Sequence, residues 1–344
     1  MVRGGDGVRP TAAEVGSADP ALADLLDRFA RRDRRALARA LSWVEDQRPG
    51  FERLLHALHG SAGSAYRVGF TGPPGAGKST LTEKYALGCR ARGETVGILA
   101  VDPSSPFTGG ALLGDRIRMQ SLSLDDGVFI RSMASRGRLG GLATTSLEAA
   151  DLLEAFGFDV VIHETVGVGQ TELDVVSAAD TTVVVLVPES GDAVQTMKAG
   201  LMEIADVFVV NKADRPGADR LERALRATLT LKARRDDAWT PPILRTVAVE
   251  GTGVDELDRA IAEHRARLAE SGALHAKRRA RVADRVRDLV ARRLERVVWW
   301  ERGGEERLSS SLDGIERGDE TPYSVAAAIA AQAGFDGQEP SREE

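Results

Sequence analysis

The sequence predicts an α/β protein built on a doubly wound, mainly parallel sheet, with helical segments before and after it. Between residues 63 and 272, short apolar runs rich in β-branched residues alternate with helical stretches, which is typical of βαβ units. The runs are almost continuously apolar, as expected of strands that helices cover on both faces of a sheet. The predicted strands are residues 67–72, 95–102, 127–132, 158–164, 181–188, 206–212 and 243–249.

The residues before the sheet predict a helical extension over 19–62. Residues 1–18 combine glycine, proline and polar side chains, a composition typical of disorder. Asp19 and Pro20 resemble a helix N-cap followed by proline at the first helical position. Apolar residues recur at helical spacing on both sides of the charged break at 31–35, so we expect two or three short helices.

The residues after the sheet, 273–344, predict a helical arm and a polar tail. The basic segment from Lys277 to Arg296 predicts an amphipathic helix, with an apolar stripe at helical spacing on one face and the charged side chains on a solvated face. The sequence at 301–304 breaks this stripe, and Thr321 with Pro322 begins a final short helix. The stripe consists of Val282, Val286, Leu289, Val290, Leu294, Val297 and Val298.

The composition excludes several classes of protein. The 344 residues carry 46 Lys and Arg against 52 Asp and Glu, a net charge of −6, so nucleic acid and anionic membranes are not expected partners. The single cysteine, Cys89, excludes a disulfide framework and any site that needs two thiolates. No apolar run reaches the ~20 residues of a membrane span, and the first residues lack a secretory signal, so we expect a cytoplasmic protein.

A glycine-rich segment directly after the first predicted strand matches the phosphate-binding pattern G-x-x-x-x-G-K-[ST]. Glycines let successive backbone N–H groups point at one anion, and the helix that follows adds its positive N-terminal end. We expect Lys78 to reach the β- and γ-phosphates and the Ser79 hydroxyl to bind Mg²⁺. The predicted phosphate-binding residues are Gly72, Pro73, Pro74, Gly75, Ala76, Gly77, Lys78, Ser79 and Thr80.

The sequence Asn211-Lys-Ala-Asp214 closes a later strand and predicts recognition of guanine. The Asp214 carboxylate can accept from both N1–H and N2–H₂ of guanine, a donor pair that adenine lacks. Lys212 can lay its alkyl stem along the base, and Asn211 can tie the loop to neighbouring backbone. A backbone N–H of the 246–249 loop, at Ala248 or Val249, is expected to meet the guanine carbonyl. The predicted ligands are therefore GTP and GDP.

Three acidic residues lie where strands end or where the following loops begin, and they predict a magnesium site. They are Asp102, Asp115 and Glu164, beside the Ser79 hydroxyl. Mg²⁺ prefers oxygen ligands in octahedral geometry and keeps several waters, so some of these carboxylates must act through water. We expect Lys78, Asp102 and Glu164 to be the catalytic residues, since they would surround the charge that develops on the γ-phosphate.

The sequence from Glu164 to Gly167 stands where many GTPases have Asp-x-x-Gly. There the Gly167 N–H can sense the γ-phosphate and reorganise when it is lost. Ras-like GTPases place a water-orienting glutamine next to that glycine, whereas here the nearest one is Gln170. The sequence also offers no unambiguous arginine finger. We therefore expect slow intrinsic hydrolysis of GTP that a partner protein accelerates.

Several segments together resemble the MeaB/ArgK family of SIMIBI-class P-loop GTPases, over roughly residues 20–333. They are GPPGAGKST, VDPSSPFTGGALLGDRIRM, ETVGVGQTE, a loop with Gly191, Asp192 and Lys198, NKAD, and TPYSVAAAIAA. The resemblance implies a G-protein chaperone of an adenosylcobalamin-dependent acyl-CoA mutase, above all methylmalonyl-CoA mutase. It implies that such a protein gates transfer of the intact cofactor from an adenosyltransferase and promotes release of inactivated cobalamin.

The resemblance also assigns roles to single residues. Asp102, Asp115 and Glu164 match the family's magnesium and switch carboxylates. Asp192 and Lys198 lie in the third switch, where the lysine links nucleotide state to the mutase. The C-terminal helices match a dimerisation arm, which implies a homodimer.

The sequence departs from the family pattern at two places, and three alternative functions stay open. The sequence at 188–191 replaces a more glycine-rich third switch, and Val247 stands where many GTPases have serine. A transport-associated kinase of the ArgK type is disfavoured by the guanine-reading motif. A metallochaperone GTPase is disfavoured because five scattered histidines and one cysteine form no evident metal cluster. A module that binds nucleotide without turnover is a further possibility.

Overall fold

The computed structural model of the chain describes residues 19–59, 65–102, 119–134, 141–165, 178–188, 200–232 and 239–335. The segment expected to be disordered, 1–18, lies outside these residues. The chain forms two compact units, one that ends at Lys277 and one that begins at Arg278. Within the described residues, no helix combines the length and apolar character that crossing a membrane requires.

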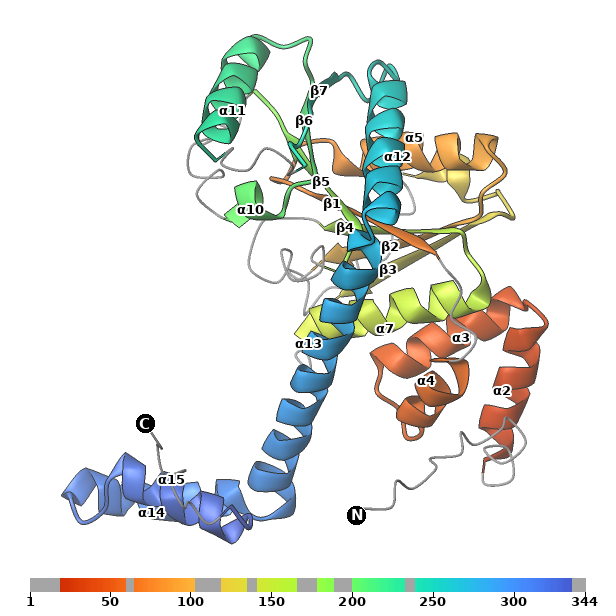
Figure 1. The fold of residues 1–344 in the computed structure, drawn as a ribbon. Coiled ribbons are helices and arrows are strands. Elements are labelled where there is room, and N and C mark those ends of the chain that lie inside the picture. The colour runs from red at the N-terminus through yellow and green to blue at the C-terminus, as the bar shows by residue number, and fades with distance from the viewer. Residues whose placement is uncertain are drawn as a thin grey trace. The chain divides into compact units, whose positions relative to one another are not determined.

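The first unit contains a seven-stranded sheet in the order β3-β2-β4-β1-β5-β6-β7 (Figure 1). Every neighbouring pair is parallel, so the doubly wound α/β fold is confirmed. The order places β1 in the middle, with later strands added on both of its sides. The strands are β1 Tyr66–Thr71, β2 Val96–Asp102, β3 Val128–Ala134, β4 Val160–Thr165, β5 Thr181–Leu186, β6 Val207–Asn211 and β7 Ile243–Thr246.

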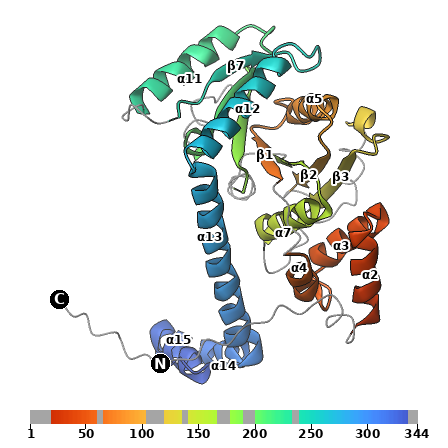
Figure 2. The same ribbon diagram turned by 45° about the vertical axis from the view of Figure 1, so that its right-hand side comes forward.

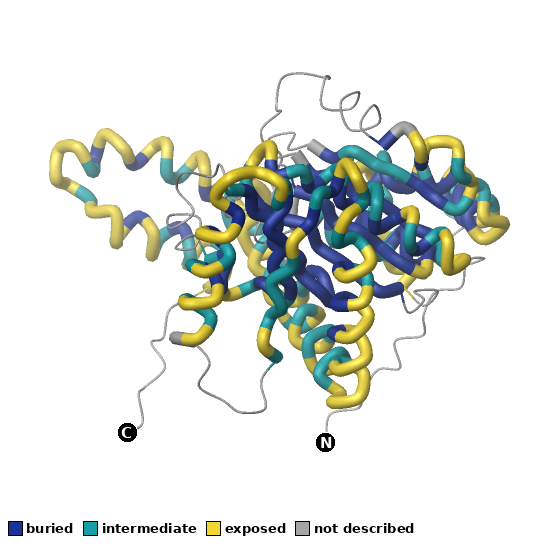
Figure 3. Tube along the Cα trace, turned by 90° about the horizontal axis from the view of Figure 1, so that it is seen from above, coloured by how far each residue is buried: buried dark blue, intermediate teal, exposed yellow. Residues whose placement is uncertain are grey.

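Helices cover both faces of the sheet, which is why its central strands are buried on both sides (Figures 1 and 3). Helices α5 (Lys78–Ala91) and α12 (Val254–Glu270) pack on one face. The other face is covered by α7 (Gly141–Phe156) on one side of β1, and by α10 (Met202–Ile204) and α11 (Ala218–Lys232) on the other. A short 3₁₀ turn, Gln120–Leu122, precedes β3.

The N-terminal helices α2 (Pro20–Ala30), α3 (Arg34–Glu45) and α4 (Phe51–His59) share one apolar core with α7, which separates them from the sheet (Figure 2). As predicted, Asp19 caps α2 by accepting from two backbone N–H groups, and Pro20 occupies the first turn.

The charged break between α2 and α3 attaches this extension to the sheet. The Arg34 guanidinium donates to the Asp126 carbonyl at 2.6 Å and to the Val128 carbonyl at the start of β3. Farther along β3, Arg131 forms a half-buried ion pair with Glu45 at 2.6 Å. Arg34, from the charged break that we expected between two helices, and Arg131, from β3 itself, therefore bind the extension to the edge strand.

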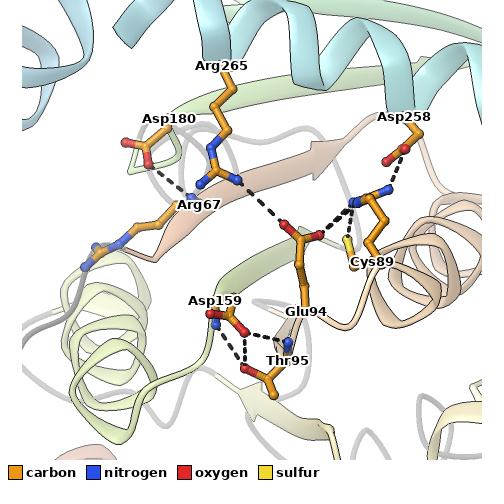
Figure 4. Close-up of polar contacts among 9 residues, drawn as sticks. Arg67, Cys89, Glu94, Thr95, Asp159, Asp180, Asp258 and Arg265 are labelled. Atoms are coloured by element: carbon orange, nitrogen blue, oxygen red, sulfur yellow. Dashed lines mark hydrogen bonds and ion pairs between the residues drawn. The ribbon is translucent and has the colours of Figure 1, made fainter.

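Polar contacts at the amino ends of the strands connect α5 to α12 (Figure 4). Arg92, which follows α5, donates to Cys89 Sγ at 3.2 Å and to Glu94 at 2.8 Å, and it pairs with Asp258 of α12 at 2.5 Å. Burial raises the pKa of the Cys89 thiol to about 12, so it stays protonated. Cys89 is a small buried helix residue, as the sequence predicted.

Asp206, directly before β6, connects five parts of the first unit. Its carboxylate accepts from the Thr182 N–H at 2.9 Å, lies 3.4 Å from His264 Nε2, and pairs with Lys277 Nζ at 3.4 Å. Its backbone carbonyl accepts from Trp239 Nε1 at 2.7 Å. Asp206 thus joins the start of β6 to the start of β5, the segment before β7, α12 and the N-terminal part of α13 (Ala273–Arg296).

The second unit consists of the rest of α13, a π-helical segment (Val297–Glu301), α14 (Gly304–Arg317) and α15 (Pro322–Gln332). We did not predict α14. Its buried positions are the small residues Gly304, Ser311 and Gly314, and Leu308 and Ile315 are half-buried. A Cβ atom on Gly304 would lie 3.1 Å from Ile329 Cγ2, which shows how closely α14 approaches α15.

The buried His264 predicts a loss of stability in acid. Burial lowers its pKa from the ordinary 6.5; Asp206 and Asp180 act in the opposite direction, while Lys277 lowers it further. The unfolded chain binds this proton more readily than the folded chain. The contribution of His264 to the free energy of unfolding is therefore complete above pH 6.5 and decreases as the pH falls toward the lower pKa of the folded chain. The expected slope is at most about 1.4 kcal/mol per pH unit for one proton.

Denaturant unfolding between pH 7.5 and pH 5 measures this slope. We expect His264→Gln to reduce it and the exposed control His275→Gln to leave it unchanged. An identical pH dependence in wild type and His264→Gln would contradict the assignment.

Candidate functional site

The loop between β1 and α5 has the geometry of a phosphate cradle. Gly72 and Gly77 adopt positive φ angles of +143° and +86°. A Cβ atom on Gly72 would lie 2.0 Å from the Val185 carbonyl oxygen of β5, so only glycine fits there. Helix α5 starts at Lys78, and no side chain caps its first turn. Its N-terminal N–H groups therefore face the loop, where an anion would accept hydrogen bonds from them.

Lys78 lies folded against this loop. Its ammonium group donates to the carbonyl oxygens of Gly72 at 2.7 Å and Pro73 at 2.9 Å, and the residue is 5% exposed. The positive charge therefore sits inside the curve of the loop.

Asn211, the last residue of β6, joins three segments that are far apart in the sequence. Its Nδ2 donates to the Ala76 carbonyl of the phosphate loop at 2.8 Å. Its Oδ1 accepts from Thr246 Oγ1 at 2.9 Å and from the Ala248 N–H at 3.1 Å. The side chain is buried, and all its bonds are made within the protein. It therefore holds the NKAD loop, the phosphate loop and the 246–249 loop in one arrangement.

The residues after Asn211 form a tight turn. Lys212 has a left-handed backbone with φ +55°, and the next N–H, from Ala213, donates to the Thr246 carbonyl at 3.0 Å. Asp214 is exposed at the tip of this turn, while Lys212 is half-buried. Ala248 is buried and Val249 is 76% exposed in the neighbouring loop.

Ser79 and Glu164 meet beside the phosphate loop. Glu164 lies in β4 opposite Phe70 of β1, and its Oε1 accepts from Ser79 Oγ at 2.5 Å. Glu164 is 5% exposed, so the carboxylate is held at the first turn of α5. Two oxygen groups at this distance, next to an expected phosphate, form part of a donor set suited to Mg²⁺.

Of the remaining predicted magnesium and switch residues, only the backbone of Asp102 belongs to the described part of the chain. Asp102 is the last residue of β2 and pairs with Ala134 in β3, at the same carboxyl edge of the sheet as the phosphate loop. Its side chain lies outside the described part of the structure, as do all atoms of Asp115, Gly167, Gln170, Asp192 and Lys198. No cluster of three or more His, Cys, Asp or Glu side chains that could hold a metal occurs among the described residues.

Two contacts that hold the segments of the site together were not predicted from the sequence. The close approach of Asn211 to Gly77 leaves only 2.3 Å between Asn211 Nδ2 and a Cβ atom placed on that glycine. The hydroxyl of Thr165, at the end of β4, donates to Thr71 Oγ1 at 3.1 Å. The motif pattern requires a glycine at 77 but carries no signal that another motif packs against it.

A glycine-rich phosphate loop between a central strand and a helix, in a parallel sheet of this order, defines a P-loop nucleotide-binding protein. The family model for the methylmalonyl-CoA mutase-associated GTPase MeaB matches residues 37–302, and the chain belongs to this family.

Known proteins agree with this assignment. A protein of Pyrococcus abyssi that is named as a GTPase is 48% identical over 312 residues, which cover 89% of this chain and 95% of that protein. GTPase ArgK of Escherichia coli is 40% identical over 260 residues, or 74% of this chain and 78% of ArgK. The crystal structure of a LAO/AO transport system kinase, 28% identical, matches with a TM-score of 0.70 over 91% of this chain and 97% of that one.

The contact between Asn211 and Gly77 predicts different costs for two glycine substitutions. Both Gly75 and Gly77 have positive φ angles, but nothing lies within 4 Å of a Cβ atom on Gly75. Gly75→Ala should therefore cost only the backbone strain of about 1–2 kcal/mol. Gly77→Ala should cost about 2 kcal/mol more, because it displaces the buried Asn211 amide from its partners.

The measurement is the free energy of unfolding of the nucleotide-free chain, from denaturant titrations of both variants. Equal losses of stability in Gly75→Ala and Gly77→Ala would contradict the packing described for Asn211.

Proposed function

We propose that this chain binds GTP with Mg²⁺ and hydrolyses it as a switch that controls an adenosylcobalamin-dependent acyl-CoA mutase, methylmalonyl-CoA mutase in the first place. In this role it gates loading of the cofactor from an adenosyltransferase and release of inactivated cobalamin. Membership of a GTPase family associated with that mutase supports the proposal. The observation that carries the nucleotide part is the Asn211 side chain, which bonds to both the phosphate loop and the 246–249 loop.

Guanine recognition rests on Asp214 and the loops that flank it. The Asp214 carboxylate, at the tip of its turn, would accept from N1–H and N2–H₂ of guanine, and Lys212 would lie along the base. The Ala248 N–H already donates to Asn211, so the 246–249 loop is fixed beside the turn. Because the Ala248 N–H is already bonded to Asn211, the Val249 N–H would be the donor to the guanine carbonyl.

The phosphates and the metal would occupy the phosphate loop. Backbone N–H groups of residues 75–80, which follow the two prolines of the loop, would bind the phosphate oxygens. Lys78 would exchange its carbonyl partners for the β- and γ-phosphates. Ser79 would ligate Mg²⁺ with Asp102, Asp115 and Glu164, directly or through water. The ion would neutralise charge that develops on the γ-phosphate during its transfer to water.

The segments that would respond to the γ-phosphate follow β4 and β5. Gly167 and Gln170 follow Glu164 closely, and Asp192 with Lys198 lie between β5 and α10. We assign the first pair to phosphate sensing and the second pair to communication with the mutase. Because a glutamine adjacent to Gly167 is missing, hydrolysis by the chain alone is slow and the mutase accelerates it.

The C-terminal helices would form a homodimer. The side chains of Val282, Val286, Leu289, Val290 and Leu294 are 42% to 57% exposed along α13, and the described chain buries no residue of this helix. An apolar stripe of this length is typical of a helix that packs against a second helix. A second copy of the chain supplies an identical stripe, so the pair can bury both.

A kinase of the transport-associated type would use ATP, and a metallochaperone would need a cluster of soft ligands. The turn that presents Asp214 favours guanine over adenine, because adenine would leave the carboxylate without donors.

The first prediction concerns the base. Asp214→Asn should weaken GTP binding about 100-fold, since it removes two charge-assisted hydrogen bonds, and should favour xanthosine triphosphate, whose edge matches an amide. Fluorescence titration with both nucleotides measures this, with the exposed Asp219→Asn on α11 as control. Unchanged GTP affinity in Asp214→Asn, or equal affinity of the wild type for ATP and GTP, would contradict the proposal.

The second prediction concerns the partners. Single-turnover GTP hydrolysis should be faster with methylmalonyl-CoA mutase than without it. If added mutase leaves the rate unchanged, the partner assignment is wrong.

For the dimer, Val286→Glu should give monomers in sedimentation experiments, whereas Ala291→Glu, which is exposed on another face of α13, should not. A Val286→Glu variant that remains dimeric would exclude the stripe as the interface.

A further inference from the structure

The strands that carry the phosphate loop and the expected γ-phosphate sensor end side by side. β1 ends at Thr71, directly before Gly72, and β4 ends at Thr165, two residues before Gly167. Phe70 and Glu164 are partners in the parallel ladder, so the two threonines are the next pair along it.

The two ends are joined by side chains on both faces of the sheet. Successive residues of a strand point to opposite faces, so Glu164 and Thr165 contact different sides. On the α5 face, Glu164 accepts from Ser79 at 2.5 Å. On the opposite face, Thr165 Oγ1 donates to Thr71 Oγ1 at 3.1 Å and lies 3.5 Å from the Phe70 carbonyl. Thr71 and Thr165 are both fully buried.

We propose that the Thr71–Thr165 hydroxyl pair is a positioning element for GTP hydrolysis, which holds the end of β4 at the phosphate loop while Glu164 changes partners. This inference rests on the proposed function. When Ser79 Oγ ligates Mg²⁺, the hydrogen bond that it donates to Glu164 in the free chain must change its geometry. The threonine pair is independent of the metal, because it lies on the other face of the sheet. It therefore keeps the start of the segment that carries Gly167 at a fixed distance from the phosphate loop.

Phosphoryl transfer depends strongly on small displacements of the groups around the γ-phosphate. Loss of one buried neutral hydrogen bond should therefore slow single-turnover hydrolysis about 5- to 10-fold in Thr165→Val and in Thr71→Val. Valine keeps the shape and the β-branched side chain, so both strands should still form. GDP contacts the phosphate loop but no γ-phosphate sensor, so GDP affinity should change less than about twofold.

The experiment measures single-turnover GTP hydrolysis, GDP affinity and the unfolding midpoint for five variants. They are Thr165→Val, Thr71→Val, the double variant, Thr165→Ser and Thr82→Val. Thr82 is the matched control, because its hydroxyl in α5 is buried and has no hydrogen-bond partner among the described residues. We expect the double variant to be no slower than either single one, Thr165→Ser to recover most of the rate, and Thr82→Val to match the wild type.

Wild-type rates in both single variants would overturn the inference. Multiplicative losses in the double variant, or a loss of GDP affinity equal to the loss of rate, would also overturn it, since they indicate independent or general structural roles. A wild-type chain that hydrolyses no GTP, with or without the mutase, would instead overturn the proposed function and this inference with it.

Discussion

The Asn211 side chain is the contact on which the candidate site depends. A parallel sheet places the ends of β1 and β6 at the same edge, but β5 lies between them, so the phosphate loop and the NKAD turn are not neighbours in the ladder. One buried amide bridges this gap by bonding to Ala76, Thr246 and Ala248. Position 77 requires glycine for the same reason, because a Cβ atom there would overlap the Asn211 amide. The two halves of a nucleotide would thus meet a single preorganised surface.

The sequence predicts the sheet well because its central strands are buried on both faces. That burial demands near-continuous apolar runs, and all seven of them became strands within a few residues of their predicted ends. The phosphate loop and the NKAD turn can be predicted equally well, because each is a short local sequence pattern with fixed backbone requirements.

Contacts between distant segments were harder to predict. Arg34 and Arg131 were unremarkable as charged residues, yet they attach the N-terminal helices to β3, since nothing in a local pattern reveals which carbonyl or carboxylate a long side chain reaches. Helix α14 was missed because its buried positions are Gly304, Ser311 and Gly314, and such residues have low helix propensity and little apolar character. Asp206 gave no signal either, although it joins β5, α12 and α13.

Asn211 is expected to hold base recognition and phosphate binding together. Titration calorimetry of the wild type and Asn211→Ala with GDP and ADP, in the presence of Mg²⁺, tests this claim most directly. We expect the wild type to prefer GDP strongly and Asn211→Ala to lose both affinity for GDP and discrimination against ADP. Undiminished GDP binding by Asn211→Ala, with the preference over ADP intact, would contradict it.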